Sequence, residues 1–207
     1  MLTLTSERSA NSRSVSPRSH RNDWIRWPRD SRFIYTIVVS DFAIANTSPD
    51  QLAAIGDIYA HHVRTGVATF ELTPPDPAEW DRRYEAVLEK GLPFLTATMD
   101  GKVAGYAYCA PWKPRCAYQS TVEDSIYLAP HAVGRGVGGR LLDELLDRCA
   151  AVGIREVIAV IADADASASL ALHRNRGFLD AGRLRAVGFK HGRWLDTLLL
   201  QRSLRDT

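Results

Sequence analysis

Four glycines fall within the six residues GRGVGG (134–139), directly before an apolar pattern of helical spacing. Glycine costs backbone entropy, so this density indicates a place where bare backbone is needed. The first N–H groups of a helix have no partner within it and lie at the positive end of the helix dipole. We therefore expect this segment to hold a phosphate or pyrophosphate group, with Arg135 adding positive charge.

Two other glycine motifs fit this segment less well. A P-loop needs a Lys followed by Ser or Thr after its last glycine, and neither follows here. The dinucleotide fingerprint GxGxxG matches formally at Gly134, Gly136 and Gly139, but it turns directly from a strand into a helix. In this chain residues 129–133 intervene. A mere turn would not require four glycines, so a pyrophosphate cradle at a helix N-terminus is the favoured interpretation.

The hydrophobic patterns and turn signals predict the elements that position this segment. Helices are expected after Ser48-Pro49 and Asp76-Pro77, after the glycine segment, and over 167–176. Strands are expected at 33–45, 93–99, 102–110, 121–128, 157–162, 183–190 and 193–202, with hairpin turns at Asp100-Gly101 and His191-Gly192. The order predicts a mixed α/β fold around a single sheet, in one domain over residues 33–207.

The first 32 residues differ in composition from the rest of the chain. They hold seven arginines against three acidic residues, whereas the 207-residue chain as a whole carries a net charge of +2. Segments rich in Ser and Arg that are poor in apolar residues do not form a packed core, so we expect residues 1–32 to be a disordered basic extension. Nucleic-acid binding through this extension is the less favoured alternative.

Several classes of protein are excluded by composition. No segment has the apolar core of a signal peptide or the roughly 18 apolar residues of a membrane span. The three cysteines, Cys109, Cys116 and Cys149, have wide spacings, so we expect neither a disulfide framework nor a metal site but a reducing cytoplasm. The six histidines form no HxxxH or HExxH pattern, and no metal is expected.

The sequence resembles the GNAT superfamily of acetyl-CoA-dependent N-acetyltransferases, in which a glycine motif after a strand binds the pyrophosphate of coenzyme A. Within it the chain is similar to the phosphinothricin/methionine-sulfoximine acetyltransferases. The similarity rests on the segments ATFELTPPDPAEW, WKPRCAY, VEDSIYL, LHRNRGF and LRAVGFKHGRWLD, which occur in this order between residues 68 and 196. It implies a largely antiparallel central sheet that splays in the middle, with flanking helices.

The resemblance also implies a set of residues for acetyl-CoA and for catalysis. Glu123 is expected as the base that deprotonates the acceptor amine, and His173 either relays the proton or is a core or capping histidine. Val133 and Ala166 depart from the family pattern, in which a Gln or Arg and an Asn are common, so the affinity for coenzyme A could be reduced. The expected cofactor contacts are the main chain of Ile126, Tyr127 and Leu128 and the loop Gly134, Arg135, Gly136, Val137, Gly138 and Gly139.

For the acceptor, the resemblance implies a small amino acid or analogue such as phosphinothricin or methionine sulfoximine. Its expected contacts are Phe70, Lys113, Arg115 and Tyr118, of which Lys113 is somewhat better explained as a plain surface lysine. A homodimer is implied, with Phe189 and Trp194 available to face a partner. Two alternatives stay open: an acetyltransferase of another amine, such as a polyamine or a peptide N-terminus, and an acyl-CoA-binding sensor with little turnover.

Overall fold

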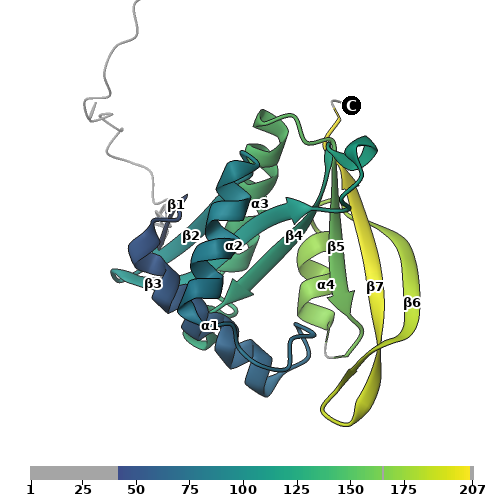
Figure 1. Cartoon of the computed structure of the whole chain (residues 1–207), viewed down its shortest axis with the longest axis horizontal. Coiled ribbons are helices and arrows are strands. Elements are labelled where there is room, and N and C mark those ends of the chain that lie inside the picture. The colour runs from purple at the N-terminus through teal and green to yellow at the C-terminus, as the bar shows by residue number, and fades with distance from the viewer. Residues whose placement is uncertain (1–41, 165, 206–207) are drawn as a thin grey trace, which may run out of the picture. The chain divides into compact units, whose positions relative to one another are not determined.

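The computed structural model describes residues 42–164 and 166–205, which form one seven-stranded sheet with helices on both faces (Figure 1). The strand order is β1-β2-β3-β4-β5-β7-β6. The strands are β1 (Phe42–Asn46), β2 (Phe94–Met99), β3 (Lys102–Pro111), β4 (Thr121–Leu128), β5 (Glu156–Ala162), β6 (Leu179–Lys190) and β7 (Arg193–Ser203). The α-helices are α1 (Leu52–Thr65), α2 (Pro77–Glu89), α3 (Val137–Ala151) and α4 (Ser167–Arg174), and short 3-10 turns are η1 (Pro49–Gln51), η2 (Cys116–Tyr118) and η3 (Pro130–Ala132).

All neighbouring strands are antiparallel except β4 and β5. These two are parallel and pair only from Thr121↔Glu156 to Asp124↔Ala159. Beyond that point β4 continues along β3 to its end, and β5 continues along β7. The sheet therefore divides after Asp124, which confirms the predicted mixed, largely antiparallel sheet with a splay in its middle.

The two faces of the sheet carry different helices. On β3, Tyr106 packs against Trp80 of α2, with the ring centroids 5.8 Å apart, whereas Cys109 lies with its Sγ 3.3 Å from that of Cys149 on α3. Residues an odd number apart on a strand point to opposite faces, so α1 and α2 cover one face and α3 covers the other. His173 of α4 contacts Asp124, the cross-strand partner of Cys109, and α4 therefore lies on the face of α3.

The predicted helix starts and turns are confirmed. Asp76 caps α2 by accepting a hydrogen bond from the Glu79 N–H at 2.8 Å, and Asp100 and Gly101 both have positive φ in the β2–β3 turn. The apolar stripe of α3 is buried throughout: Leu141, Leu142, Leu145, Leu146 and Cys149.

The start of β6 differs from the prediction, and only part of the first predicted strand can be compared with the structure. Strand β6 begins at Leu179, four residues before the predicted start at Arg183, and its register shifts twice, between Asp180 and Gly182 and between Leu184 and Gly188. These irregularities break the alternation of apolar residues by which a strand is read from sequence. The predicted extension over 1–32 and the first part of the predicted strand, residues 33–41, lie outside the described residues.

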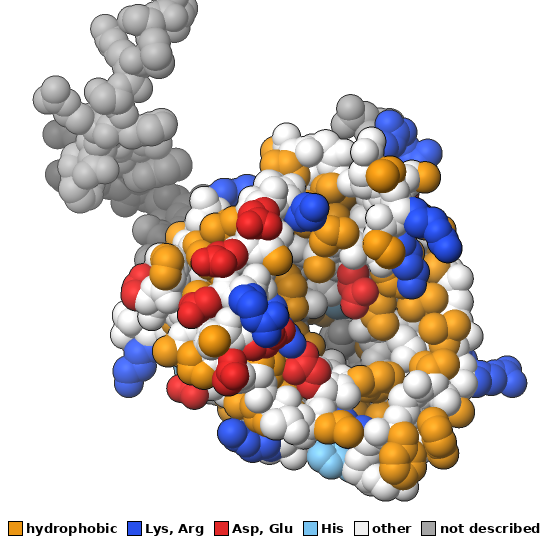
Figure 2. All heavy atoms as spheres, in the orientation of Figure 1, with side chains coloured by type: hydrophobic (Ala, Val, Ile, Leu, Met, Phe, Trp, Pro, Cys, Tyr) orange, Lys and Arg blue, Asp and Glu red, His pale blue; other side chains and the backbone are white. Residues whose placement is uncertain are grey.

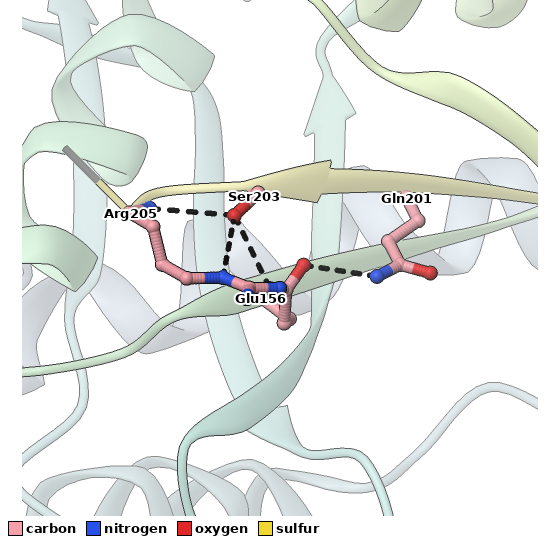
Figure 3. Close-up of polar contacts among 4 residues, drawn as sticks. All are labelled: Glu156, Gln201, Ser203 and Arg205. Carbon is pink, nitrogen blue, oxygen red and sulfur yellow. Dashed lines mark hydrogen bonds and ion pairs between the residues drawn. The ribbon is translucent and has the colours of Figure 1, made fainter. Parts of the chain in front are cut away.

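A polar network holds the start of β5 to the end of β7 (Figure 3). The Glu156 carboxylate accepts hydrogen bonds from Gln201 at 2.9 Å, from Arg205 Nε at 2.9 Å and from Ser203 at 3.2 Å. Burial alone raises the pKa of Glu156, but these donors outweigh it and the net pKa is lowered. Because the folded pKa is below that of the unfolded chain, the network stabilises the fold at neutral pH.

Glu156→Gln should therefore lower the free energy of unfolding at pH 7, because charge-assisted hydrogen bonds are lost. We expect a loss of about 1 kcal/mol, since water partly screens the charge of the exposed Arg205. The stabilisation is present above the unfolded pKa and is lost as the pH falls through the folded value. Urea unfolding at pH 7 and near pH 3 measures both, with the exposed Glu85→Gln as the control. An undiminished difference between wild type and Glu156→Gln at pH 3 would contradict this assignment.

Candidate active site

The gap between β4 and β5 exposes backbone hydrogen-bonding groups of β4. The N–H of Ala129 donates to the Ala104 carbonyl of β3 at 2.9 Å. Because backbone groups alternate sides along an antiparallel strand, those of Leu128 and Ile126 point away from β3, toward β5. The Leu128 carbonyl accepts a hydrogen bond from His62 Nε2 at 2.9 Å. The backbone groups of Ile126 face the part of the gap where β5 no longer pairs, and they can bind an extended ligand in the manner of an added strand.

The glycine loop lies at the open end of this gap. A Cβ placed on Gly138 would come within 3.3 Å of Leu128 Cδ1, so the first turn of α3 packs against the last residue of β4. Gly134 and Gly136 have φ of +76° and +79°, and Gly136 is the N-cap of α3. No atom lies within 4 Å of a Cβ built on either glycine, so backbone conformation, not lack of space, selects glycine there.

The amides at the start of α3 have the arrangement that the predicted phosphate cradle would require. The N–H of Arg140 donates to the Gly136 carbonyl at 3.2 Å, so the N–H groups of Val137, Gly138 and Gly139 precede the helical hydrogen-bond ladder. They lie at the positive end of the α3 dipole. Arg135 is exposed in the same loop, and a diphosphate bound there would meet both the amides and this charge.

The first turn of α3 contacts Arg176, a residue that the sequence did not single out. Arg176 donates from Nε to the Gly139 carbonyl at 3.0 Å and to Asp143 at 2.7 Å. A Cβ on Gly139 would lie 2.3 Å from the Arg176 guanidinium. Through these contacts Arg176, just after α4, helps to fix the position of the first turn of α3.

Glu123 lies on β4 directly beside the point where the strands divide, on the face that α1 and α2 cover. Its side chain is partly buried. Burial raises the pKa of Glu123, the neighbouring Asp124 charge adds to the rise, and the Lys113 ammonium opposes it. A carboxylate with a raised pKa is a better proton acceptor near neutral pH than an ordinary glutamate.

His173 lies on the other face of β4, because it contacts Asp124 and strand residues alternate in direction. Its Nε2 is 3.0 Å from Asp124 Oδ2, and its Nδ1 donates to the Ser169 carbonyl at 2.7 Å. The ring packs edge-on against Phe178, with centroids 5.0 Å apart. Both ring nitrogens are thus engaged by groups other than Glu123. Asp124 itself was missed as a candidate, although alternation along VEDSIYL already places it opposite Glu123.

Phe70 belongs to a loop between α1 and α2 that is attached to β6. Its ring lies against Gly188, where a Cβ would come within 2.3 Å of the ring. Lys190, which is buried, donates from Nζ to the neighbouring Thr69 carbonyl at 2.8 Å. Phe70 is 40% exposed, so one side of the ring remains available for contact. Sequence reasoning named Phe70 but not the residues of β6 that hold it.

The three polar candidates between β3 and β4 are not equivalent. Lys113 stacks its Nζ 4.5 Å from the Trp112 ring centroid and is close enough to Glu123 to affect its pKa. Arg115 is the N-cap of the exposed 3-10 turn η2, and Tyr118 is the last residue of that turn. Among the described residues, Lys113 is the one of the three whose charge acts on Glu123, so the structure joins it to the site more closely than the sequence suggested.

Figure 2 shows this face of the molecule hollowed between the helical part, α1 and α2, and the β6–β7 hairpin. Acidic and basic side chains gather over the helical side of the hollow, and apolar side chains cover much of the hairpin (Figure 2). Within residues 42–164 and 166–205 there is no cluster of three metal-ligating side chains and no helix long and apolar enough to cross a membrane.

This fold and loop define an acetyltransferase of the GNAT type, and residues 55–178 match the acetyltransferase (GNAT) family model. The chain belongs to this family. It is 54% identical to a phosphinothricin N-acetyltransferase of Alcaligenes faecalis, over 75% of this chain and 79% of that protein. It is 36% identical to an L-methionine sulfoximine/L-methionine sulfone acetyltransferase of Pseudomonas paraeruginosa, over 80% of this chain and 96% of that protein.

A solved structure supports the same relationship. The phosphinothricin acetyltransferase of Sinorhizobium meliloti, in complex with acetyl-CoA, superposes with a TM-score of 0.77 and 46% sequence identity. The match covers 79% of this chain and 89% of that one. The fold and family expected from the sequence are therefore confirmed.

Proposed function

We propose that this protein transfers the acetyl group of acetyl-CoA to the α-amino group of a small amino acid or analogue, such as phosphinothricin or methionine sulfoximine. The observations that carry the proposal are the N-terminal amides of α3, the edge of β4 that is unpaired with β5 beyond Asp124, and the partly buried Glu123 beside that edge. The names of the two relatives supply the acceptor class, and the relative from Sinorhizobium meliloti binds acetyl-CoA.

Acetyl-CoA would place its diphosphate on the amides of Val137, Gly138 and Gly139, with Gly134 and Gly136 shaping the loop. Its pantetheine arm would pair with the backbone of Ile126 and Leu128, flanked by Tyr127. Val133 is exposed and stands where the family carries a Gln or Arg. The missing polar side chain does not alter the backbone amides of α3. Three aligned amides and a helix dipole provide the main grip on the phosphates.

In the reaction, Glu123 accepts a proton from the acceptor ammonium, and the amine nitrogen attacks the thioester carbon. A tetrahedral intermediate forms, the carbon–sulfur bond breaks, and its electron pair leaves with the sulfur of coenzyme A. The second proton that the nitrogen must lose passes to this sulfur, so the products are the amide and the free thiol of coenzyme A. The Ile126 N–H, directed into the gap, is suited to stabilise the oxyanion. The mechanism is direct transfer without an acyl-enzyme, because Cys116 is exposed in its loop with no histidine bonded to it among the described residues.

The acceptor would lie against Phe70, with Lys113 beside its carboxylate or phosphinate. Arg115 and Tyr118, which are exposed in the same loop, are proposed as further contacts for these oxyanions.

We also propose residues 33–207 as the catalytic domain, residues 1–32 as a basic extension, and the cytoplasm as the compartment of the protein. The three unpaired thiols suit a reducing environment.

Glu123→Gln should reduce kcat by roughly 10²- to 10⁴-fold, because the amide cannot take the proton. In the wild type the activity should fall as the pH drops through the raised pKa of Glu123, and this acidic limb should disappear in the variant. Thiol release from acetyl-CoA with phosphinothricin or methionine sulfoximine measures both, with the exposed Glu85→Gln as control. Turnover of Glu123→Gln at the wild-type rate would exclude Glu123 as the base.

Gly188→Ala should raise KM for the acceptor on the order of 10-fold, because the added methyl group overlaps the Phe70 ring and displaces it. KM for acetyl-CoA should stay unchanged. Gly182→Ala is the matched control on the same strand, since no atom lies within 4 Å of a Cβ there. Equal acceptor KM values for the two variants would show that Phe70 does not line the acceptor site.

We propose a homodimer that forms through the β6–β7 hairpin. Strand β6 is an edge strand of the sheet, and Trp194 is 67% exposed beside Phe189, with ring centroids 5.2 Å apart. An exposed apolar edge strand is a ready site for a second chain. Sedimentation at micromolar protein should show a dimer, and Trp194→Ser should shift it toward monomer. A monomeric wild type under these conditions would end the proposal.

A further inference from the structure

The segment that carries Phe70, residues 66–76, connects α1 to α2 without a helix or strand of its own. Its position therefore depends on side-chain contacts with neighbouring elements. Before Phe70, two elements hold Thr69. The Tyr59 hydroxyl of α1 lies 2.6 Å from Thr69 Oγ1, and Lys190 Nζ of β6 donates to the Thr69 carbonyl at 2.8 Å.

After Phe70, an ion pair with α2 holds Glu71. Arg83 Nη2 lies 2.8 Å from Glu71 Oε1, and Arg83 Nε donates to Glu79 Oε1 at 2.7 Å. The side chains of Arg83 and Glu71 are only 26% and 33% exposed. Water and salt therefore screen this pair less than they screen an ion pair at the surface.

The Arg83 guanidinium is itself held in place by contacts within the helical part of the molecule. Its Cζ lies 5.5 Å from the Trp80 ring centroid and 5.9 Å from that of Tyr59, and both rings are buried. A cation is attracted to the face of an aromatic ring. Together with Glu79, the rings orient Arg83 toward Glu71, so the ion pair forms with a small further loss of side-chain entropy.

The ion pair also lies near the proposed base. Tyr108 of β3 is the cross-strand partner of Ser125, two residues along β4 from Glu123 and on the same face. Burial raises the pKa of Tyr108, and the charges of Arg83 and Glu71 act on it in opposite directions. Both charges are therefore within electrostatic range of the residues beside Glu123.

We propose that Arg83 is a positioning residue for the acceptor site. Its ion pair with Glu71 fixes the backbone after Phe70, as the contacts of Thr69 fix the backbone before it. The Phe70 ring is thereby kept against Gly188 and provides a fixed wall for the side chain of the acceptor amino acid. The inference rests on the proposed function, and Arg83 takes part in no proton transfer.

The test compares Arg83→Met with Arg82→Met, with kcat and both KM values measured by thiol release. Methionine keeps an apolar stem against the rings and removes the charge. We expect Arg83→Met to raise KM for the acceptor roughly 5- to 10-fold, with kcat and KM for acetyl-CoA unchanged. Arg82 is the matched control, because it is the adjacent arginine, is 74% exposed and also pairs with Glu79. Arg83→Lys keeps the charge and should recover part of the acceptor affinity.

Glu71→Gln tests the same ion pair from its other side and preserves the shape of the side chain. It should also raise KM for the acceptor. Because Arg83 acts through Glu71, the double variant should have no higher acceptor KM than Arg83→Met alone. Additive increases, equal acceptor KM values for Arg83→Met and Arg82→Met, or a parallel rise of both KM values would each overturn the proposal.

The hold on the segment is also measured without the reaction. Chymotrypsin cleaves after Phe and Leu, and Phe70 and Leu72 are 40% and 72% exposed. Cleavage at these residues, followed by mass spectrometry, should be faster in Arg83→Met than in Arg82→Met, because a segment must open locally to be cut. Equal cleavage rates would overturn the proposal. Absence of acetyl transfer by the wild type would instead refute the proposed function, so the two failures are distinguishable.

Discussion

The structure depends on the separation of β4 from β5 after a single short stretch of parallel pairing. Unpaired backbone groups inside a protein are costly, and a sheet normally closes to satisfy them. Here β4 stays paired with β3, and β5 with β7, beyond the point where β4 and β5 separate, so their other backbone groups face the gap. The Glu156 network at the paired end adds to this hold on β5. The gap is therefore a stable feature that a ligand with amide groups can fill.

Helix α3 places its N-terminus at the mouth of this gap. Its buried leucines pack on the sheet, and its N-terminus comes against the last residue of β4. The helix is thereby fixed with its free amides at the mouth of the gap. Arg176, which follows α4, donates a hydrogen bond to the same turn, so this turn is supported both by the end of β4 and by the segment after α4. Rigid support of this kind lets a loop of glycines bind an anion without first losing its own disorder.

The alternation of side chains along β4 places two groups of polar residues on the two faces of the sheet. Glu123 and the loop that carries Phe70 belong to the face of α1 and α2, where an acceptor would enter. Asp124 and His173 belong to the face of α3 and α4, where the coenzyme would lie. Adjacent residues of one strand thus point to different surroundings, because a strand alternates its side chains between faces. The last hairpin closes the acceptor side by packing Gly188 against Phe70.

The local pattern of the chain was sufficient to predict the order of helices and strands, the caps, the tight turns and the glycine loop that precedes α3. Each of these depends on neighbouring residues: Asp76 caps a helix that starts next to it, and Gly136 permits a φ that other residues avoid. The resemblance of five short segments to known acetyltransferases added the family and named Glu123. The early start of β6 could not be read, because two bulges interrupt its periodicity.

Contacts between distant segments were decided only by the tertiary structure. The pairing of His173 with Asp124, the support of Gly139 by Arg176 and the seating of Phe70 on Gly188 each join residues more than 30 positions apart. The same holds for the point at which β4 and β5 separate, since it depends on which strand each one pairs with. Sequence pattern encodes the conformation of a segment and which of its sides is apolar. Packing of the whole chain decides which segment contacts each side. The residues of the candidate site are brought together by those contacts.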